Sequence, residues 1–479
     1  MVGMLLFRFG GQAITFIILA LLARYLGPEQ FGLYSSLTVF IGFCAILLTP
    51  SLNDLLIREA VGASAGGGVR SGIGKLQALR GGYGLRLTLA FAGLMLAITI
   101  GPLLGWGQIS LSLFLLAGLS LFSSLTTPSL RTAYDVPYQL DYRMDTSAGI
   151  NFAGRLLLLA SLYIAIRFDS NLTGVILGQA LGEGLGFALL LLLLWYGGYP
   201  VLPEFTFTRL RPLLVLAAPL IVAEAFTLAY TRLDVLLLNQ LVGAREAGIY
   251  SGPIRLIDGL QLIPTVVLGS LIPLLNRLKT TSTDNYFSAV RIGSRLLWAA
   301  GIVCALTIAP FSVWLTNLFL GGEFGDSAII LQIGVLGAPL VFAGALLPAL
   351  LIIEGESKQI VKLYFSLAVI SVILNLILIP RYGAVGSIYS KLISYAAIFP
   401  VALVWRKSRL LASTLLLQGI LPYILAVITS YYTVRMMLPL IPGMPLILIA
   451  SISAIMLSGW FGRKKLTELR TLFTMERNP

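Results

Sequence analysis

The sequence predicts an all-α polytopic membrane protein with about fourteen transmembrane helices. Of its 479 residues, 58% are hydrophobic and only 11% are charged, and its mean hydropathy is +0.94. Soluble domains contain about 25% charged residues, so this chain lacks the polar side chains needed to cover soluble domains. A bilayer-spanning helix needs about 20 mostly apolar residues. Segments of that kind lie near 4–26, 30–57, 81–102, 109–131, 146–167, 172–196, 212–240, 248–275, 294–317, 327–353, 359–380, 384–405, 412–435 and 444–462.

The loop cations predict the orientation of these spans. With the N-terminus inside, the inside loops and the C-terminal tail contain 22 of the 33 Lys and Arg residues, and the outside loops contain 5. An excess of this size on one side predicts that both termini face the cytoplasm. It also accounts for most of the formal net charge of +13 without a nucleic-acid partner. The longest inside loop, 59–80, is glycine-rich, and we expect it to be a flexible basic connector.

Composition also narrows the chemistry. The chain has no histidine, which excludes imidazole catalysis and imidazole metal sites. Its two cysteines, Cys44 and Cys304, lie in apolar runs and are read as core thiols. No external loop exceeds about a dozen residues, which leaves little room for the acceptor site of a membrane glycosyltransferase or polymerase. We therefore expect no catalytic residue, no metal site and no cofactor.

An internal repeat divides the chain. Leu26–Ser35 and Val242–Ser251 share two glycines, a tyrosine and a serine at a constant offset of 216 residues, and Tyr382–Gly386 is a weaker echo. The first glycine can end a helix in a left-handed cap, and the second permits close packing. We expect the tyrosine near the outer membrane interface. The repeat predicts two pseudo-symmetric six-helix lobes, 1–204 and 205–410, followed by two further helices and a basic tail in 411–479.

Several charges lie inside the predicted spans. A charge at the bilayer centre costs about 2.5–3.5 kcal/mol, so these side chains should face a watery cavity or one another. The arginine side chain can bind two phosphate oxygens at once and stays charged when partly desolvated, so the cations form a candidate cationic cavity for a phosphorylated lipid. They are Arg155, Arg232, Arg255 and Lys391, with Arg8 and Arg86 nearer the inner ends, where snorkelling to the interface is the alternative.

The accompanying acids are candidates for ion coupling. Glu183, Glu224, Asp234 and Asp258 lie within predicted spans, and Asp54 lies near an inner end. Glu183 or Glu224 could bind H⁺ or Na⁺, and a permanent ion pair with a neighbouring arginine is the alternative. Asp258 lies three residues after Arg255 and can pair with it on one helical face. With the repeat offset, Glu224 is at the position in the second repeat that is equivalent to Arg8 in the first. We hypothesise that these two side chains approach each other in one state of the transport cycle.

Several motifs resemble a known family. Arg24–Tyr34, Ser51–Glu59 and Asp234–Leu238 with the following Gly248/Tyr250 turn are similar to the polysaccharide flippase (Wzx-like) branch of the multidrug/oligosaccharidyl-lipid/polysaccharide exporter superfamily. This resemblance implies two lobes in a V around a cationic cavity. It also implies a non-enzymatic transporter in the plasma (inner) membrane that moves a polyprenyl-pyrophosphate-linked oligosaccharide from the cytoplasmic to the outer leaflet by alternating access. The implied partners are that glycan lipid, membrane lipids and polysaccharide-assembly enzymes.

Other functions remain open. The main alternative is an ion-coupled multidrug/cation antiporter of the same superfamily, which would favour an anionic cavity, whereas here the intramembrane cations outnumber the clearly buried anions. A membrane glycosyltransferase is disfavoured by the short external loops and the lack of histidine. A non-transporting scaffold of a biosynthetic complex is compatible with the same sequence.

Overall fold

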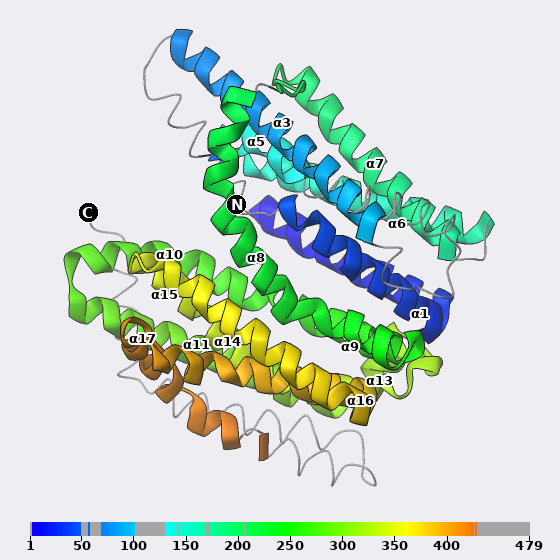
Figure 1. Ribbon diagram of the computed structural model, residues 1–479, viewed down its shortest axis with the longest axis vertical. Helices are drawn as coiled ribbons and strands as arrows, with labels where there is room; N and C mark the ends of the chain where they lie inside the picture. Colours follow the sequence, from blue (N-terminus) through cyan, green and yellow to red (C-terminus); the bar gives the residue numbers. More distant parts are fainter. Residues whose placement is uncertain are drawn as a thin grey trace. The chain divides into compact units, whose positions relative to one another are not determined.

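The computed structural model describes residues 2–48, 56–57, 69–100, 130–141, 143–168, 172–205, 207–425 and 427–428. Within these ranges the chain is helical and contains no β-strand (Figure 1). The residue contacts divide it into two units, Met1–Gly248 and Ile249–Pro479. Among the described residues, seven helices are long and apolar enough to cross a membrane, or eight if the bent pair Ser327–Val335 and Ala338–Ile353 is one span. The prediction of an all-helical, multi-pass membrane protein is therefore confirmed.

The described part of the first unit consists mainly of long helices. In chain order they are α1 (Val2–Cys44), the 3-10 helix η1 (Ala45–Leu48), α3 (Val69–Ile100), α5 (Val136–Leu140), α6 (Met144–Phe168), α7 (Leu172–Tyr196) and α8 (Phe207–Leu241), and α9 (Ala244–Gly259) crosses into the second unit. The predicted spans 146–167 and 172–196 coincide with α6 and α7. The expectation of a flexible 59–80 connector was wrong from Val69 onward, because α3 begins there and continues the helix that was predicted from 81.

The second unit has shorter helices and more breaks. It contains α10 (Leu262–Thr281), α11 (Thr283–Ile308), η3 (Ala309–Phe311), α12 (Ser312–Phe319), η4 (Gly322–Phe324), α13 (Ser327–Val335), α14 (Ala338–Gly344), α15 (Leu346–Ile353), α16 (Ser357–Val404) and α17 (Arg406–Leu417). The predicted span 327–353 corresponds to α13, α14 and α15. Most of the predicted span 109–131 and all of 444–462 lie outside the described residues, so the number fourteen, like the N-in/C-in orientation and the three-part domain division, stays a prediction.

Glycines with positive φ break the longest helices where the repeat predicted it. Gly27 (φ 66°) divides α1, Gly243 (φ 132°) separates α8 from α9, and Gly383 (φ 56°) divides α16. L-residues with a side chain rarely adopt this conformation, so glycine is required to end one helix before the next begins. The helix breaks at the repeat glycines are therefore as predicted, with positive φ, and α1 and α16 each correspond to two predicted spans.

The second glycine of each repeat permits very close backbone contact. A Cβ atom on Gly32 would lie 1.8 Å from the carbonyl oxygen of Ala244, and one on Gly248 would lie 1.7 Å from that of Pro28. The two repeats therefore contact each other directly, backbone against backbone. The repeat tyrosines are buried within the protein: Tyr34 is 4% exposed and Tyr250 is fully buried. Their hydroxyls have protein partners, Gln179 for Tyr34 and Lys391 for Tyr250, and their position near the outer membrane interface stays a prediction.

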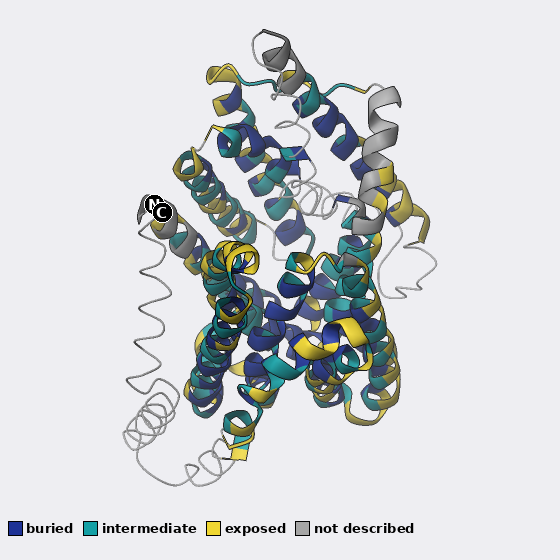
Figure 2. Ribbon diagram, turned by 90° about the vertical axis from the view of Figure 1, so that its left-hand side faces the viewer, coloured by how far each residue is buried: buried dark blue, intermediate teal, exposed yellow. Residues whose placement is uncertain are grey.

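Small residues also bring α6 and α7 together. Gly178, Gly182 and Gly186 recur every four residues on α7 and form one face of the helix. A Cβ atom on Gly178 would lie 2.6 Å from the Cβ atom of Ala165, and one on Gly182 would lie 2.2 Å from Oγ of Ser161. Such small-residue faces are the usual way for membrane helices to approach closely. The two helices lie side by side (Figure 1). Buried and exposed residues alternate along the described helices, so that a helix has a buried and a more exposed face (Figure 2).

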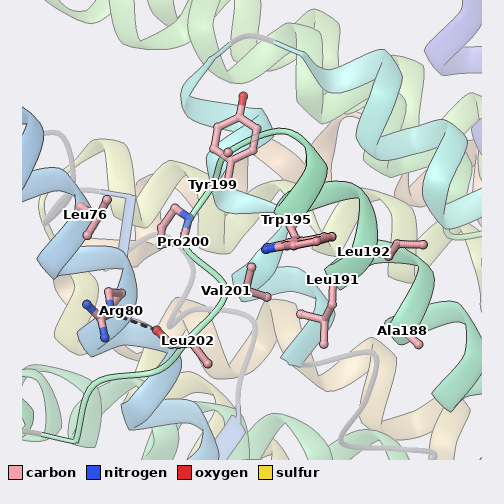
Figure 3. A pocket seen from close by; sticks show the side chains of 11 residues that line it. Leu76, Arg80, Ala188, Leu191, Leu192, Trp195, Tyr199, Pro200, Val201 and Leu202 are labelled. Carbon is pink, nitrogen blue, oxygen red and sulfur yellow. Dashed lines mark hydrogen bonds between the residues drawn. The ribbon is translucent and has the colours of Figure 1, made fainter.

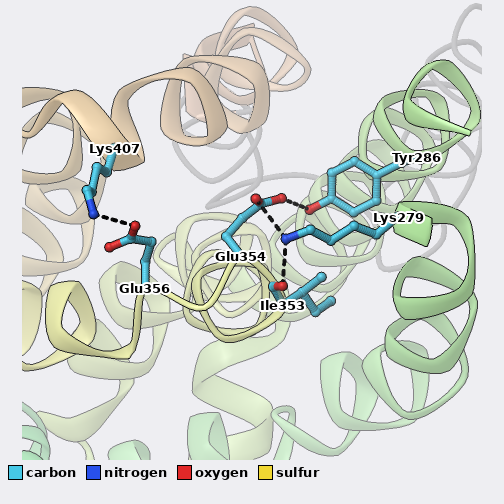
Figure 4. A network of polar contacts seen from close by, with 6 residues as sticks. All are labelled: Lys279, Tyr286, Ile353, Glu354, Glu356 and Lys407. Atoms are coloured by element: carbon cyan, nitrogen blue, oxygen red, sulfur yellow. Dashed lines mark hydrogen bonds and ion pairs between the residues drawn. The ribbon is translucent and has the colours of Figure 1, made fainter.

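A polar network ties helix ends together in the second unit. Lys279 Nζ donates to the carbonyl of Ile353 (2.7 Å) and to Oε2 of Glu354 (2.9 Å), and the Tyr286 hydroxyl donates to Oε1 of Glu354 (2.9 Å). Glu354 is thus held by α10 and α11 at once (Figure 4). Nearby, Lys407 Nζ pairs with Oε1 of Glu356 at 2.5 Å, with 61% of the lysine side chain exposed.

Candidate functional site

The first unit contains a charge cluster made by Arg131, Asp135, Arg155 and Glu183. Arg131 is 6% exposed, and its Nη2 donates to the carbonyls of Ile150 on α6 (3.1 Å) and Gly186 on α7 (3.3 Å). The carboxylate of Glu183 interacts electrostatically with both Arg131 and Arg155. Two cations and two anions therefore lie together within the helices of this unit.

Glycines make the space for the Arg131 guanidinium. A Cβ atom on Gly154 of α6 would lie 2.1 Å from Nη2 of Arg131, and one on Gly186 of α7 would lie 3.3 Å from Nη1. Any larger residue at Gly154 would displace the charged group. The guanidinium is therefore built into the α6–α7 contact, and its two carbonyl partners stabilise the charge inside a low-dielectric environment.

Asp135 is the buried acid of the cluster. It is 6% exposed, and Nδ2 of Asn151 donates to its Oδ2 (3.0 Å). Its Oδ1 is buried and has no hydrogen-bond partner in the described part of the chain. A buried carboxylate oxygen without a donor is costly, and the side chains of Asn151 and Ser147, together with the charge of Arg131, offset part of this cost.

Arg155 joins α6 to α1. Its Nη1 donates to the hydroxyl of Thr15 and to the carbonyl of Gly11 (3.5 Å). A Cβ atom on Gly11 would lie 3.2 Å from Cδ of Arg155, so the glycine also gives the side chain room. Arg155 is thus a predicted cavity cation that interacts with a predicted ion-coupling acid, Glu183.

Among the described residues of the second unit, Lys391 is a deeply buried cation. It is 5% exposed, its Nζ lies 3.3 Å from the hydroxyl of Tyr250, and 5.6 Å from the centre of that ring. A cation above an aromatic face is attracted by the ring quadrupole, more strongly when both are desolvated. Lys391 shares its helix face with Ser387 and Ser394, and Ser390 precedes it; all three serines are fully buried, so Lys391 lies in a polar seam.

That seam joins the two halves of α16. Asn375 Nδ2 donates to Oγ of Ser371 (3.3 Å), and Oγ of Ser390 donates to the Ser371 carbonyl (3.4 Å). In the part of the chain that the structure describes, Oδ1 of Asn375 and the hydroxyls of Ser387 and Ser394 have no hydrogen-bond partner. The surroundings of Lys391 are therefore rich in oxygen acceptors, which suits a buried ammonium group.

The other predicted site residues are placed as follows. Arg86 is 2% exposed and its Nη1 donates to the Leu48 carbonyl (3.2 Å), so it is buried against η1 rather than extended toward an interface. Asp234 is 4% exposed, and its Oδ1 accepts from the backbone N–H of Val235 (2.9 Å). The remaining predicted residues with described side chains are half-buried: Arg232 and Glu224 on α8, and Arg255 and Asp258 on α9. Arg8 lies in α1, and its side chain, like Asp54, is outside the described residues.

Sequence reasoning missed Arg131 and Asp135. Counting loop cations assigned Arg131 to an inside loop, whereas the structure buries it between α6 and α7. The error arose because this residue lies at the end of a predicted span, where an arginine is usually read as an interface residue. A usable signal was present: the i, i+4 spacing of Arg131 and Asp135 on one helical face.

Comparisons with known proteins agree with this architecture. The chain is similar in structure to the lipid II flippase MurJ in an inward closed conformation, with a TM-score of 0.72 and 12% identity over 96% of this chain and 99% of that one. It is also similar to an inward-facing multidrug resistance MATE family transporter of the MOP superfamily, with a TM-score of 0.64 and 14% identity over 83% of this chain and 94% of that one. At these identities the likeness establishes the fold. No curated protein sequence matches the chain.

The family itself is established by sequence. Residues 4–279, more than half of the chain, match the family described as polysaccharide biosynthesis protein. This match and the fold of the MOP superfamily agree with the resemblance seen in the repeat and hairpin motifs. The chain therefore belongs to the polysaccharide biosynthesis protein family.

Proposed function

We propose that this protein is a flippase that moves a polyprenyl-pyrophosphate-linked oligosaccharide from the cytoplasmic to the outer leaflet of the plasma (inner) membrane. The observation that carries this proposal is the set of cations inside apolar helices, of which Arg131, Arg155 and Lys391 are examples whose contacts the structure describes. A chain that had only to span the bilayer would not retain charges whose burial is this costly. A transporter of an anionic lipid headgroup would use them.

The family and the fold support the same proposal. Polysaccharide assembly requires sugar chains that are built on a lipid carrier to reach the other leaflet, and a lipid II flippase has this fold. In this proposal fourteen spans with both termini inside form two six-helix lobes that alternate in access. The protein is not an enzyme, and its partners are the glycan lipid, the bilayer and polysaccharide-assembly enzymes.

The cavity residues have separate roles in this proposal. Arg155, Arg232, Arg255 and Lys391 bind the pyrophosphate, with Arg8 and Arg86 as further cations of the cavity. Arginine contributes a fork of donors that matches phosphate oxygens, and lysine a compact charge. Glu183, Glu224, Asp234 and Asp258 are the candidates for H⁺ or Na⁺ coupling. Glu183 is the strongest of these, because it already interacts with Arg131 and Arg155 and would gain or lose their attraction if substrate competed for the cations.

The experiment uses cells that lack this gene. Lipid-linked sugars are extracted, and the leaflet that holds them is determined with an impermeant reagent. The expected result is accumulation of a pyrophosphate-linked oligosaccharide on the cytoplasmic face, relieved by wild-type protein but not by Arg232→Ala combined with Arg255→Ala. Arg167→Gln is the matched control, because this arginine lies on α6 and contacts only Tyr163 among the described residues. No accumulation, with altered efflux of cationic drugs instead, would refute the flippase and favour the antiporter suggested by the MATE-like fold.

A further inference from the structure

A groove on the first unit lies apart from the charge cluster. It is formed by α3, the last turns of α7 and the segment 197–202, and it has a volume of about 730 Å³ (Figure 3). Its floor and walls are apolar, with Leu76, Leu191, Leu192 and Val201 among them. Pockets for one small ligand have volumes of about 300–1,000 Å³, so the groove can hold one chain-like apolar group.

The groove is a built feature rather than a gap between helices. Gly198 (φ 73°) ends α7 with a left-handed turn, and the N–H groups of Gly198 and Tyr199 donate to the carbonyls of Trp195 and Leu194 (both 3.0 Å). The hydroxyl of Tyr134 donates to the Val201 carbonyl (3.2 Å), and that of Tyr199 donates to Oδ2 of Asp141 (2.6 Å). The 197–202 wall is therefore fixed at several points.

Arg80 supplies the one cation of the lining. It lies one turn after Leu76 on α3, and its Nε donates to the Leu202 carbonyl (3.1 Å), while its own carbonyl accepts from the N–H of Glu204 (2.9 Å). This bond holds the guanidinium plane against the wall of the groove. Within the described residues its two Nη groups make no hydrogen bond, which leaves them for a ligand. None of the 11 lining residues is acidic.

Trp195 adds an aromatic side chain of the kind found at membrane interfaces. Its side chain is 65% exposed in the last turn of α7, and its indole faces Val201 across the groove (Figure 3). Tryptophan is enriched where lipid headgroups begin, because its ring is apolar and its N–H is polar. By the loop-cation count, this end of α3 and α7 faces the cytoplasm, where the leaflet surface is negative.

We propose that this groove binds one anionic phospholipid of the surrounding leaflet, with an acyl chain along α7 and the phosphodiester at the Nη groups of Arg80. Charge selects this occupant. A single guanidinium matches the single negative charge of a phosphodiester, whereas a pyrophosphate carrier would favour a lining with more than one cation. The site would keep a lipid bound beside the moving helices, and it does not depend on which substrate the protein transports.

The test measures lipid retention by the purified full-length protein. Native mass spectrometry compares phosphatidylglycerol with phosphatidylcholine of identical chains. One favourable arginine near a lipid phosphate contributes about 1 kcal/mol, so the wild type should prefer the first bound phosphatidylglycerol about fivefold. Arg80→Gln should lose this preference, and Arg80→Lys should keep most of it. Lysine keeps the positive charge but cannot make the Nε hydrogen bond to the Leu202 carbonyl. Comparing Arg80→Gln with Arg80→Lys therefore separates the effect of the charge on lipid binding from the effect of that hydrogen bond on the groove wall.

Two further arms make the result decisive. Phosphatidylglycerol with a brominated acyl chain should quench wild-type fluorescence more than that of Trp195→Phe, because a large part of the quenched emission comes from the groove. Arg167→Gln removes an exposed arginine elsewhere and should leave the preference unchanged. Equal retention of the two phospholipids by the wild type, or an unchanged preference in Arg80→Gln, would overturn the proposal. Displacement of phosphatidylglycerol by polyprenyl phosphate in the wild type but not in Arg80→Gln would also overturn it, by identifying the carrier as the occupant.

Discussion

Replacing Gly248 by alanine tests whether the two sequence repeats touch as the structure shows. The new Cβ atom would lie 1.7 Å from the carbonyl oxygen of Pro28, 2.7 Å from its carbonyl carbon and 3.1 Å from the backbone nitrogen of Gly32. All three are backbone atoms of the α1 turn, so no side-chain rotation can relieve the overlap. The two turns must separate by more than 1 Å to restore ordinary van der Waals contact.

The magnitude follows from similar insertions into packed interiors. Adding a methyl group to a filled site costs about 1–3 kcal/mol, occasionally more. The overlap here is severe, so we expect the upper end of that range. For a domain of about 150–250 residues each kcal/mol lowers Tm by about 2–4 °C. Gly248→Ala should therefore lower the Tm of the purified protein by on the order of 10 °C, and Gly32→Ala by a similar amount, because its Cβ would lie 1.8 Å from the Ala244 carbonyl oxygen.

The assay is thermal unfolding in detergent, followed by intrinsic fluorescence. Gly81→Ala and Gly184→Ala are the matched controls, because both glycines are helical and a Cβ atom on either would meet nothing within 4 Å. Alanine is the better helix former by about 0.5–1 kcal/mol, so these variants should be as stable as wild type or slightly more stable. The double variant of Gly32 and Gly248 should lose less than the sum, because one separation relieves both overlaps. A Gly248→Ala protein with an unchanged Tm would refute the contact.

Three further predictions concern polar contacts. Arg131→Met should lower the free energy of unfolding by about 3–5 kcal/mol, because it leaves buried Asp135 without its cation and the Ile150 and Gly186 carbonyls without a donor. A Tm within about 2 °C of wild type would contradict the burial of the charge. Glu354→Ala should lower the free energy of unfolding by about 1 kcal/mol, because it removes the acceptor of both Lys279 and Tyr286. Lys407→Ala should change the free energy of unfolding by less than about 0.5 kcal/mol, because its pair with Glu356 is exposed. Equal losses in the two variants would be inconsistent with the network. The hydrogen bond to Asp141 raises the pKa of Tyr199 above its ordinary value near 10. A raised folded pKa means that this bond stabilises the protein fully below about pH 10 and is lost as the pH rises through the folded pKa. The Tm difference between wild type and Tyr199→Phe should therefore vanish in strongly alkaline buffer, and a difference that persists there would show that the bond is not the cause.

Much of the helical architecture was predictable, because lipid imposes long apolar helices on any chain that crosses it. The breaks at Gly27, Gly243 and Gly383 were predictable for the same kind of local reason, since only glycine adopts their φ angles readily. The ends of helices were less predictable: α3 continues back to Val69 through glycine-rich sequence that composition alone assigns to a loop. A membrane helix can extend beyond the bilayer without any change in hydropathy that marks its end.

The presence of charged residues inside the membrane spans was predictable from the sequence, but not every residue of the charge cluster was. The sequence identifies Arg155, Lys391 and Glu183 as candidates because a charged residue within an apolar run is costly, and their roles stay predictions. Arg131 was missed because its burial depends on two glycines on other helices, Gly154 and Gly186, and such contacts follow from tertiary packing. The burial of the repeat tyrosines was not predictable for the same reason, because their partners Gln179 and Lys391 lie 145 and 141 residues away.

The most direct test of the proposed flippase activity is reconstitution of the purified protein into vesicles with the pyrophosphate-linked oligosaccharide that accumulates in cells lacking the gene. The fraction of this lipid in each leaflet is followed over time with an impermeant glycan-modifying enzyme. Wild type and Arg167→Gln should translocate the lipid. Arg155→Gln and Lys391→Gln should do so at rates reduced by about tenfold or more, the equivalent of about 1.4 kcal/mol for each lost cation. Translocation no faster than in empty vesicles, or full rates in both cation variants, would contradict the proposal.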